Sequence, residues 1–350
     1  MKKIQPTGRT AATLFAATDL GMLPIQRPAQ RGLCAALVVA AGMGGGIASA
    51  QSILPPGALN QFNQAVGSRI EAVNILGGDY AAAGGFYTFS GGDHADLNIT
   101  KLGGSGAVTS PMPLDLWGLS WAPILQGNLG IVSAQNTYKS GFLAGNQMNY
   151  DTLAVEAGGG AALYINDHLS LSPTISGIYG SVENKFSPHN ANGALLESFG
   201  HGTVVDWTMD TWSAVPSLAA DYQWMWGRTT FDFSSTYSFF HTDSFESTSP
   251  LLSLKGDSST WANKLDVDVP LGWTVLGHEL HTGGFLSRTE VFGDAATGLN
   301  TEYVYTANAR VVLDFLGKLW KVKWLGLGAS YYWGKDLSGW AVGADVRFKF

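Results

Sequence analysis

Hydrophobic and polar residues alternate along most of the chain after residue 78, in segments that end at clusters of Gly, Asn, Asp and Ser. In one segment, for example, Phe231 and Phe233 flank Asp232. Successive side chains of a β-strand point to opposite faces, so this period of two indicates strands with one apolar and one polar face. The pattern predicts about twelve strands, near residues 79–90, 95–109, 114–136, 148–165, 168–184, 201–221, 223–241, 258–270, 272–290, 300–315, 319–333 and 338–350.

The length of these strands and the rhythm of their connections favour a membrane barrel. Most strands exceed the roughly five or six residues usual in globular proteins and reach the roughly nine to eleven that cross a bilayer at a tilt. Tight turns are expected near Asn166, Gly227 and Pro270, whereas SPHNANGALLESFGHG and TDSFESTSPLLSLKGDSS are expected to be long loops. Short turns that alternate with long loops are typical of outer-membrane barrels. We therefore predict an all-β fold, a closed antiparallel transmembrane β-barrel of about twelve strands.

Composition agrees with this fold class. Charged residues make up 13% of the chain, against about 25% in ordinary globular domains. The mean hydropathy is only +0.08, and no run of apolar residues after position 51 is long enough for a membrane-spanning helix. A period of two cannot say which face is buried, so a soluble periplasmic β protein remains an alternative. The formal net charge of −7 disfavours nucleic-acid binding.

The N-terminal region predicts export. Residues 1–50 contain Arg27 and Arg31, an apolar stretch that begins at Leu33, and an Ala-Ser-Ala site that ends at residue 50. This order is typical of a cleaved signal peptide. A signal peptide that began at Met22 would have the ordinary length, so we expect that translation starts at Met22. The single cysteine, Cys34, falls within the signal peptide, so no disulfide is expected after cleavage.

A linker and an amphipathic helix are expected over residues 51–78. Apolar residues recur every three or four positions between residues 58 and 76, after Pro55-Pro56 and before Gly77-Gly78. It is the one helix that we expect in the chain. The barrel then occupies residues 79–350. A helix is about 10–12 Å across, and a twelve-stranded barrel is intermediate between filled and open barrels, so we expect this helix to lie in or under the lumen as a plug.

Charged residues of the strands fall on the polar face, and we expect them to line the lumen because charges inside a membrane must face a wet or paired interior. A structural network that closes the lumen and a conducting, selective pathway are both open interpretations. The expected lining residues are Glu156, Asp232, Lys264, Asp266, Asp268, Glu279, Arg310, Asp314, Asp345 and Arg347.

Motifs for a metal site or a hydrolase active site are weak in this sequence. The segment GHELHTGG places His278 and His281 three residues apart, on opposite faces of a strand, whereas a zinc-protease helix needs His-Glu-x-x-His. The acidic segment SGGDHAD around His94 is too loose to predict a calcium site. No nucleophile motif of a hydrolase is present, although a barrel enzyme could assemble a triad across strands. We expect no metal, no cofactor and no enzymatic activity, and an outer-membrane hydrolase of lipids is kept as the alternative.

Several segments resemble a known family, among them SRIEAVNILGGDY, LDLWGLSWAPILQGNLG and LGASYYWGKDLSGWAVGADVRFKF. A helix followed by a twelve-stranded barrel that ends in Phe is similar to the translocator domain of autotransporters, and these segments are similar to the solitary outer-membrane autotransporter-like barrels. The resemblance covers roughly residues 55–350. Only Gln51 to Leu54 would precede Pro55 after cleavage, so we expect a barrel without an exported passenger.

The resemblance implies a location and partners. The protein is expected in the outer membrane of a Gram-negative bacterium, after export by its cleaved signal peptide, in contact with outer-membrane lipids. Periplasmic chaperones and the barrel-assembly machinery would handle it on the way, and small solutes would be its cargo if the lumen conducts. Its expected function is a narrow, porin-like pore or a plugged structural or docking barrel.

The last residues carry a testable part of this expectation. Barrels of this kind commonly end in an aromatic residue that the assembly machinery recognises, and the chain ends with Phe348 and Phe350. Deletion of Phe350 should leave the protein in the periplasm, as measured by fractionation of the cell envelope. Normal insertion of the shortened chain would contradict this role for the last residue.

Overall fold

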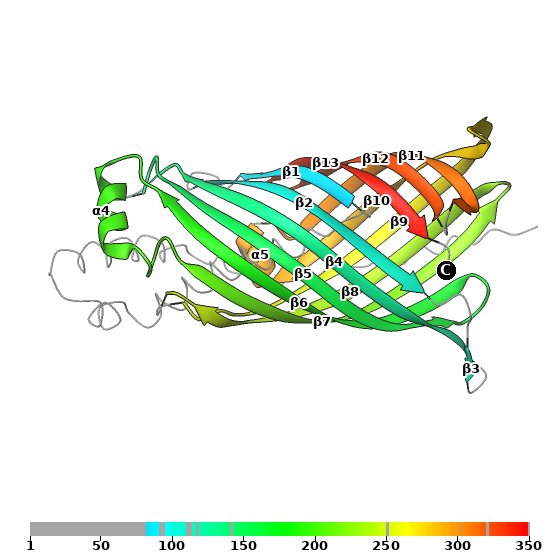
Figure 1. Cartoon of the computed structure of the whole chain (residues 1–350), viewed down its shortest axis with the longest axis horizontal. Helices are drawn as coiled ribbons and strands as arrows, with labels where there is room; N and C mark the ends of the chain where they lie inside the picture. Colours follow the sequence, from blue (N-terminus) through cyan, green and yellow to red (C-terminus); the bar gives the residue numbers. More distant parts are fainter. Residues whose placement is uncertain are drawn as a thin grey trace, which may run out of the picture.

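The computed structural model describes residues 82–90, 95–109, 114–116, 119–140, 143–249, 252–299, 301–319 and 322–348. The predicted signal peptide, the helix expected between residues 58 and 76, and Phe350 lie outside these residues. The described part is almost entirely sheet, as Figure 1 shows. Its elements are β1 (Ala82–Ser90), β2 (Ala95–Thr109), β3 (Leu114–Leu116), β4 (Leu119–Tyr138), β5 (Gln147–Tyr164), β6 (Leu169–Ser187), α4 (Ala191–Gly200), β7 (Thr208–Trp226), β8 (Thr229–Ser247), β9 (Lys255–Val275), β10 (His278–Gly293), α5 (Asp294–Leu299), β11 (Tyr303–Leu319), β12 (Val322–Gly334) and β13 (Leu337–Phe348).

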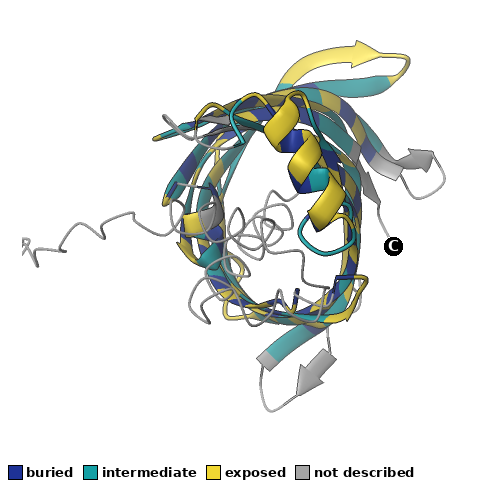
Figure 2. Cartoon of the chain, turned by 90° about the vertical axis from the view of Figure 1, so that its left-hand side faces the viewer, coloured by how far each residue is buried: buried dark blue, intermediate teal, exposed yellow. Residues whose placement is uncertain are grey.

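The sheet closes on itself. Every strand pairs antiparallel with its neighbours, and the first strand pairs with the last, so that Phe86 of β1 lies opposite Trp340 of β13. The short β3 forms a small hairpin with the start of β4, while β2 pairs with the rest of β4. The remaining twelve strands form one barrel wall, seen end-on in Figure 2. The predicted fold class, a closed antiparallel barrel of twelve strands, is confirmed.

The two ends of the barrel differ. Tight turns join β5 to β6, β7 to β8 and β9 to β10 at the end where the chain finishes, and we call this the turn end. The opposite end, which we call the loop end, carries α4 and α5 (Figure 1) as well as a two-residue turn between β12 and β13. Gly227 and Gly277, in two of the tight turns, have positive φ angles that favour glycine.

Several strand ends differ from the prediction. The turn expected near Pro270 is wrong, because β9 continues to Val275 and the chain turns at Leu276-Gly277. The expected long loop between β8 and β9 is also wrong in length, since only residues 248–254 separate them. The first part of the expected strand 114–136 is the separate β3. Beyond the membrane a strand no longer needs an apolar outer face, so its alternation fades and its end cannot be located from the pattern.

The expectation of a single helix is wrong as well, because the described loops contain α4 and α5. The side chain of Asn190 caps α4 by accepting a hydrogen bond from the N–H of Gly193 at 2.9 Å. Asn146, in the loop between β4 and β5, donates to Asn190 and accepts from the N–H of His189. A helix this short is marginal in water on its own. It depends on this contact from another loop, so the local sequence pattern does not predict it.

The outside of the barrel wall is apolar. Outward-facing Leu102, Leu125, Ile175 and Leu327 each keep more than 60% of their surface exposed. Exposed apolar patches of this extent mark contact with a partner or with lipid, and a closed barrel meets lipid through this face. Among the described residues, no helix combines the length and the hydropathy that crossing a bilayer requires.

Aromatic residues border the apolar wall at both ends. Near the turn end Trp224 stacks on Phe231, with ring centres 5.1 Å apart, and Tyr222 lies beside Trp224. Near the loop end Trp333 stacks on Tyr305 at 5.6 Å. Along β7, the outward Trp212 and Tyr222 are separated by about 33 Å of strand, which at a tilt of about 40° matches an apolar band about 25 Å tall. These belts place the barrel across a membrane.

Charged residues on the outer face gather at and beyond the loop-end belt. Lys185 pairs there with Glu183 at 2.7 Å, and His241 lies 2.7 Å from Asp257. Charges of this kind mark the water-exposed rim of the barrel.

A charge within the outer apolar band should be costly. Leu218, on β7 between Trp212 and Tyr222, is 51% exposed. Leu218→Arg should lower the free energy of unfolding by about 2–4 kcal/mol, because arginine would be held near the middle of the bilayer. Denaturant unfolding in phospholipid vesicles measures the change. Leu195→Arg, at a similarly exposed leucine of α4, is the control and should have little effect; equal losses in both variants would contradict the membrane placement.

Candidate functional site

The face opposite the apolar wall points into the lumen, and most of the expected lining residues have a described position on it. They alternate along their strands with outward residues such as Val155, Phe233, Leu265 and Val311. The exception is Arg347, whose side chain lies outside the described part, as does that of Phe348. The residues found on the inner face are Glu156, Asp232, Lys264, Asp266, Asp268, Glu279, Arg310, Asp314 and Asp345.

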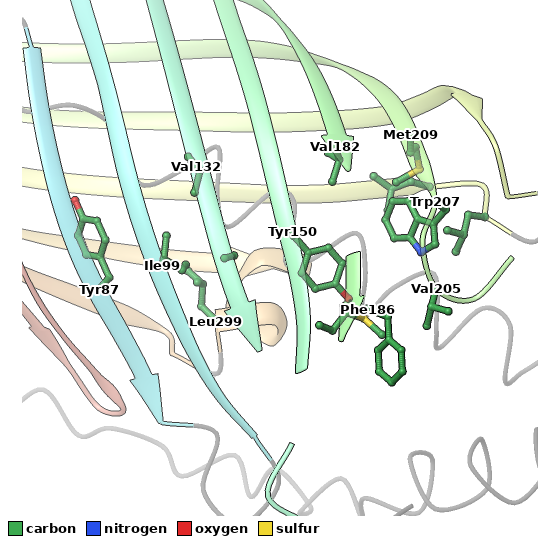
Figure 3. Packing of buried hydrophobic residues seen from close by; sticks show 14 of the residues in the cluster. Tyr87, Ile99, Val132, Tyr150, Val182, Phe186, Val205, Trp207, Met209 and Leu299 are labelled. Atoms are coloured by element: carbon green, nitrogen blue, oxygen red, sulfur yellow. Dashed lines mark hydrogen bonds between the residues drawn. The ribbon is translucent and has the colours of Figure 1, made fainter. Parts of the chain in front are cut away.

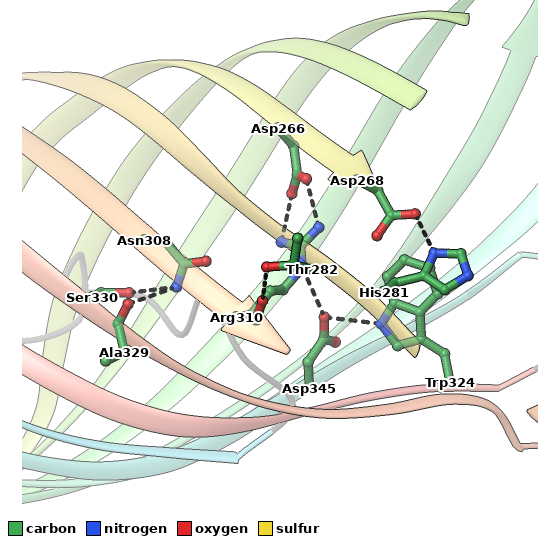
Figure 4. A network of polar contacts seen from close by, with 10 residues as sticks. All are labelled: Asp266, Asp268, His281, Thr282, Asn308, Arg310, Trp324, Ala329, Ser330 and Asp345. Carbon is green, nitrogen blue, oxygen red and sulfur yellow. Dashed lines mark hydrogen bonds and ion pairs between the residues drawn. The ribbon is translucent and has the colours of Figure 1, made fainter. Parts of the chain in front are cut away.

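Arg310 is the centre of a charged network in the lumen (Figure 4). Its guanidinium holds Asp266 with two hydrogen bonds, of which that from Nη1 is 2.8 Å long. Asp345 approaches the Arg310 Nε to 3.9 Å and accepts a hydrogen bond from Trp324 at 3.3 Å. The Trp324 ring also lies 6.0 Å from the guanidinium. With Arg310 only 6% exposed, this is a buried ion network shared by β9, β11, β12 and β13.

A glycine makes room for this network. Gly283 of β10 lies opposite both Asp268 of β9 and Arg310 of β11 in the strand registers. A Cβ atom at this position would lie 2.6 Å from the carbonyl oxygen of Val267 and 3.5 Å from the Arg310 Nε. The missing side chain therefore lets the arginine lie close to the wall and reach the carboxylate on β9, one strand beyond its neighbour.

His281 and Asp268 form a second pair in the same region. Nδ1 of His281 lies 2.8 Å from a carboxylate oxygen of Asp268, and both side chains are largely buried. An aspartate that orients a histidine in this way occurs in hydrolases, where the other ring nitrogen faces a nucleophile. Here Nε2 of His281 has no hydrogen-bond partner among the described residues. The pair therefore has the orienting half of a catalytic triad without a described nucleophile.

The described residues contain no group of three or more His, Cys, Asp or Glu side chains placed to hold a metal ion. His94 of the segment SGGDHAD lies outside them. On the opposite side of the barrel, the inner wall has a small pocket lined by Lys101, Asn128 and Glu156 among others. Nearby, Gln126 donates a hydrogen bond of 2.7 Å to Ser176. In this part of the barrel, the inner wall is therefore polar around Arg310 and also across the lumen, on β2, β4 and β5.

The lumen changes character toward the loop end, where its inner wall is apolar (Figure 3). Tyr87 of β1 contacts Tyr332 of β12 with ring centres 5.0 Å apart, and Tyr150 of β5 lies 6.2 Å from Trp207. The loops contribute to the same cluster. We call it the apolar collar; its buried members are Tyr87, Ile99, Val132, Ala134, Met148, Tyr150, Val182, Phe186, Leu196, Val205, Trp207, Met209, Leu252, Leu254, Leu299, Val304, Tyr332, Leu337 and Ala341.

Sequence reasoning missed the apolar collar, although a signal was present. The inner face of β5 reads Met148, Tyr150 and then Thr152 and Glu156, so it changes from apolar to polar along one strand. The same change occurs along β6, where Val182 and Phe186 follow Ser176. An inner face that becomes apolar toward one end indicates a change in what fills the lumen, and it can be found by comparing the inner positions of neighbouring strands.

Comparison with known proteins decides the family. The family model described as the solitary outer membrane autotransporter beta-barrel domain matches residues 110–343, more than half of the chain. The chain belongs to this family. A solitary autotransporter barrel resides in the bacterial outer membrane, so its turn end faces the periplasm and its loop end the outside. The resemblance inferred from the sequence is confirmed. No curated protein matches the chain.

Solved structures agree with this family in fold. The transport unit of the autotransporter AIDA-I from Escherichia coli has a TM-score of 0.54 at 8% identity and covers 83% of this chain and 99% of its own. The beta domain of the Bordetella autotransporter BrkA has a TM-score of 0.50 at 16% identity, with coverage of 77% and 97%. The translocator domain of NalP from Neisseria meningitidis has a TM-score of 0.50 at 10% identity, with coverage of 77% and 86%. At these identities the likeness concerns the fold alone.

The ion network of this solitary autotransporter barrel should contribute to its stability. Arg310→Met would leave Asp266 and Asp345 buried beside no cation, and should lower the free energy of unfolding by about 3–5 kcal/mol. The double variant Asp266→Asn with Arg310→Met should recover part of this loss, because it removes one of the unpaired charges. Denaturant unfolding in vesicles measures both.

The exposed pair between Lys185 and Glu183 supplies the control for this prediction. Lys185→Met removes an ion pair of similar distance at the water-exposed rim, where solvent screens the charges. Its unfolding midpoint should stay at that of the unchanged protein. Equal shifts of the unfolding midpoint in the Arg310 and Lys185 variants would show that burial of the network does not affect stability.

Proposed function

We propose that this protein is a narrow outer-membrane pore that rests closed, with the apolar collar as its gate. The observation that carries the proposal is the change along the lumen from a charged wall at the periplasmic side to an apolar, buried cluster at the outer side. The proposal contains no catalytic step.

The physical basis is the behaviour of water in an apolar constriction. Apolar constrictions in channels gate by dewetting, because a narrow apolar passage is an unfavourable place for water and ions. Tyr150, Trp207 and Met209 are each less than 8% exposed. A dry collar would stop ions even where the backbone wall around it is as wide as in the polar half.

Loop contacts support the closed arrangement. Figure 2 shows α4 lying across one side of the opening, and its Leu196 belongs to the collar. Ser258 accepts a hydrogen bond of 3.0 Å from the N–H of Ala295, which attaches α5 to β9. Leu299 of α5 also joins the collar. Because loops from three connections meet in one cluster, opening requires that they separate together.

The charged network supports a role below the gate. Arg310 with Asp266 and Asp345 gives the inner wall a charged region that a polar solute or a hydrated ion would pass. The helix expected between residues 58 and 76 would add a second closure; it lies outside the described residues and stays a prediction. In this proposal, small polar solutes are the cargo when the collar opens.

Removal of the collar tryptophan tests the proposal. Trp207 is 1% exposed and contacts Tyr150. Trp207→Ala should increase the frequency of open-channel events at least about tenfold, since loss of the ring opens and wets the constriction. Recordings of purified protein in planar bilayers measure the current.

The matched control is Trp212→Ala, five residues along the same region but on the lipid-facing side, where the ring is 45% exposed. Its currents should equal those of the unchanged protein. Equal, unchanged currents from both tryptophan variants would refute the collar as the gate. High conductance of the unchanged protein would refute the closed resting state.

A further inference from the structure

The hairpin formed by the ends of β9 and β10 extends beyond the barrel wall. The pairing of β9 with β8 ends at Asp268, opposite Thr230, whereas β9 continues to Val275. Figure 1 shows this hairpin at the turn end, rising above the neighbouring strands, and Figure 2 shows it outside the ring of strands. It therefore points away from the lumen, sideways from the barrel.

A bulge produces this departure. His281 of β10 lies opposite Pro270, but the preceding Leu280 lies opposite Trp273, so Leu271 and Gly272 are extra residues in β9. Gly272 has a φ of 72°, which glycine adopts without strain. Extra residues of this kind bend a strand and increase its twist. The bend is thus built into the chain at the point where the hairpin leaves the wall.

The hairpin beyond the bulge is apolar and exposed. Leu271 is 37% exposed, Trp273 68%, Val275 41% and Leu276 89%. Residues 269–278 include no Asp, Glu, Lys or Arg. We call the residues from Leu271 to Leu276 the hairpin tip. An unpaired strand edge with these side chains would be an aggregation hazard in water, so the tip requires a partner.

The turn itself points to a role for its leucine. Leu276 and Gly277 both have positive φ angles, 52° and 80°, which is the geometry of a type I′ turn. Asn-Gly is the preferred sequence for such a turn, and leucine is strained at this φ. A leucine that is both strained and almost fully exposed has no benefit for the fold, which leaves contact with an apolar partner as the reason for its presence.

We propose that the hairpin tip is a lipid anchor that inserts into the periplasmic leaflet of the outer membrane. The tip leaves the barrel beside Thr230, next to the turn-end belt formed by Trp224 and Phe231, and so continues the lipid-facing surface. At its base Arg228 pairs with Glu279 of β10, so an exposed ion pair borders the apolar tip at the periplasmic rim of the barrel. An apolar surface with charged groups at its border is the usual form of an interfacial anchor.

This inference rests on the membrane location of the family and is independent of the closed pore. The occupant is phospholipid, because the tip projects sideways into the plane of the bilayer and adjoins a surface that already contacts lipid. A periplasmic protein or a second copy of the chain would instead leave the tip in water when the protein is alone in a bilayer. The experiment below separates these occupants.

A single spin label at the tip tests the proposal. Leu276→Cys is made in a Cys34→Ser background, which leaves no other cysteine, and Asp167→Cys in the turn between β5 and β6 is the matched site at the same end. The labelled proteins are reconstituted at high dilution in vesicles of phosphatidylethanolamine and phosphatidylglycerol. Accessibility of the label to oxygen and to a water-soluble nickel chelate is measured by electron paramagnetic resonance.

The ratio of oxygen to nickel accessibility should be at least about threefold higher at position 276 than at position 167, because oxygen concentrates in the acyl region of the bilayer. Equal ratios at the two positions would overturn the proposal and leave a protein partner as the occupant. Val275→Cys provides a second labelled position within the tip, and it should follow position 276. Single-channel currents of these variants should stay unchanged, so failure here leaves the proposed gate unaffected.

Discussion

Within a bilayer every backbone N–H and C=O must find its partner inside the protein, since no water is present to replace a missing one. This constraint explains the closure of the sheet. Each strand of the wall pairs with two neighbours, and the pairing of β1 with β13 closes the ring. With only nine residues, β1 is short, yet its register with β13 covers eight positions. The rest of the architecture follows from a wall without edges.

A closed wall divides its side chains into two populations with different solvents. Outward residues meet lipid and are apolar, with aromatic rings at both borders of the band. Inward residues meet one another, and the barrel uses them in two ways. Around Arg310 the inward residues form a buried ion network. The buried guanidinium is tolerated because carboxylates on two other strands pair with it. Around Trp207 the inward residues resemble the core of a soluble protein.

The loops belong to the second of these regions. Leu196 of α4 and Leu299 of α5 are buried with inner-wall residues such as Tyr150 and Val304. At the outer mouth, loop residues thus pack against the inner wall, while polar side chains line the periplasmic half. The hairpin tip is the exception to this division, because it leaves the wall at a bulge and exposes apolar residues at the turn end.

The sequence by itself determined the class of the fold. A period of two specifies a strand with an apolar and a polar face, and the frequency of Gly, Asn and Asp clusters specifies about how many strands there are. It also placed charged residues such as Asp266 and Arg310 on the polar face. These are local properties, because each depends only on residues next to one another in the chain.

Only the tertiary structure decided which residues meet. Asp266, Arg310 and Asp345 come from three different strands, and their contact depends on the registers of β9 to β13. The apolar collar depends on the closure that brings β1 beside β13 and on loops that pack against the inner wall. The turn at Leu276-Gly277 depends on a bulge that the alternation of apolar and polar residues does not predict. Register and closure are relations between distant segments, so a periodic pattern along one segment does not contain them.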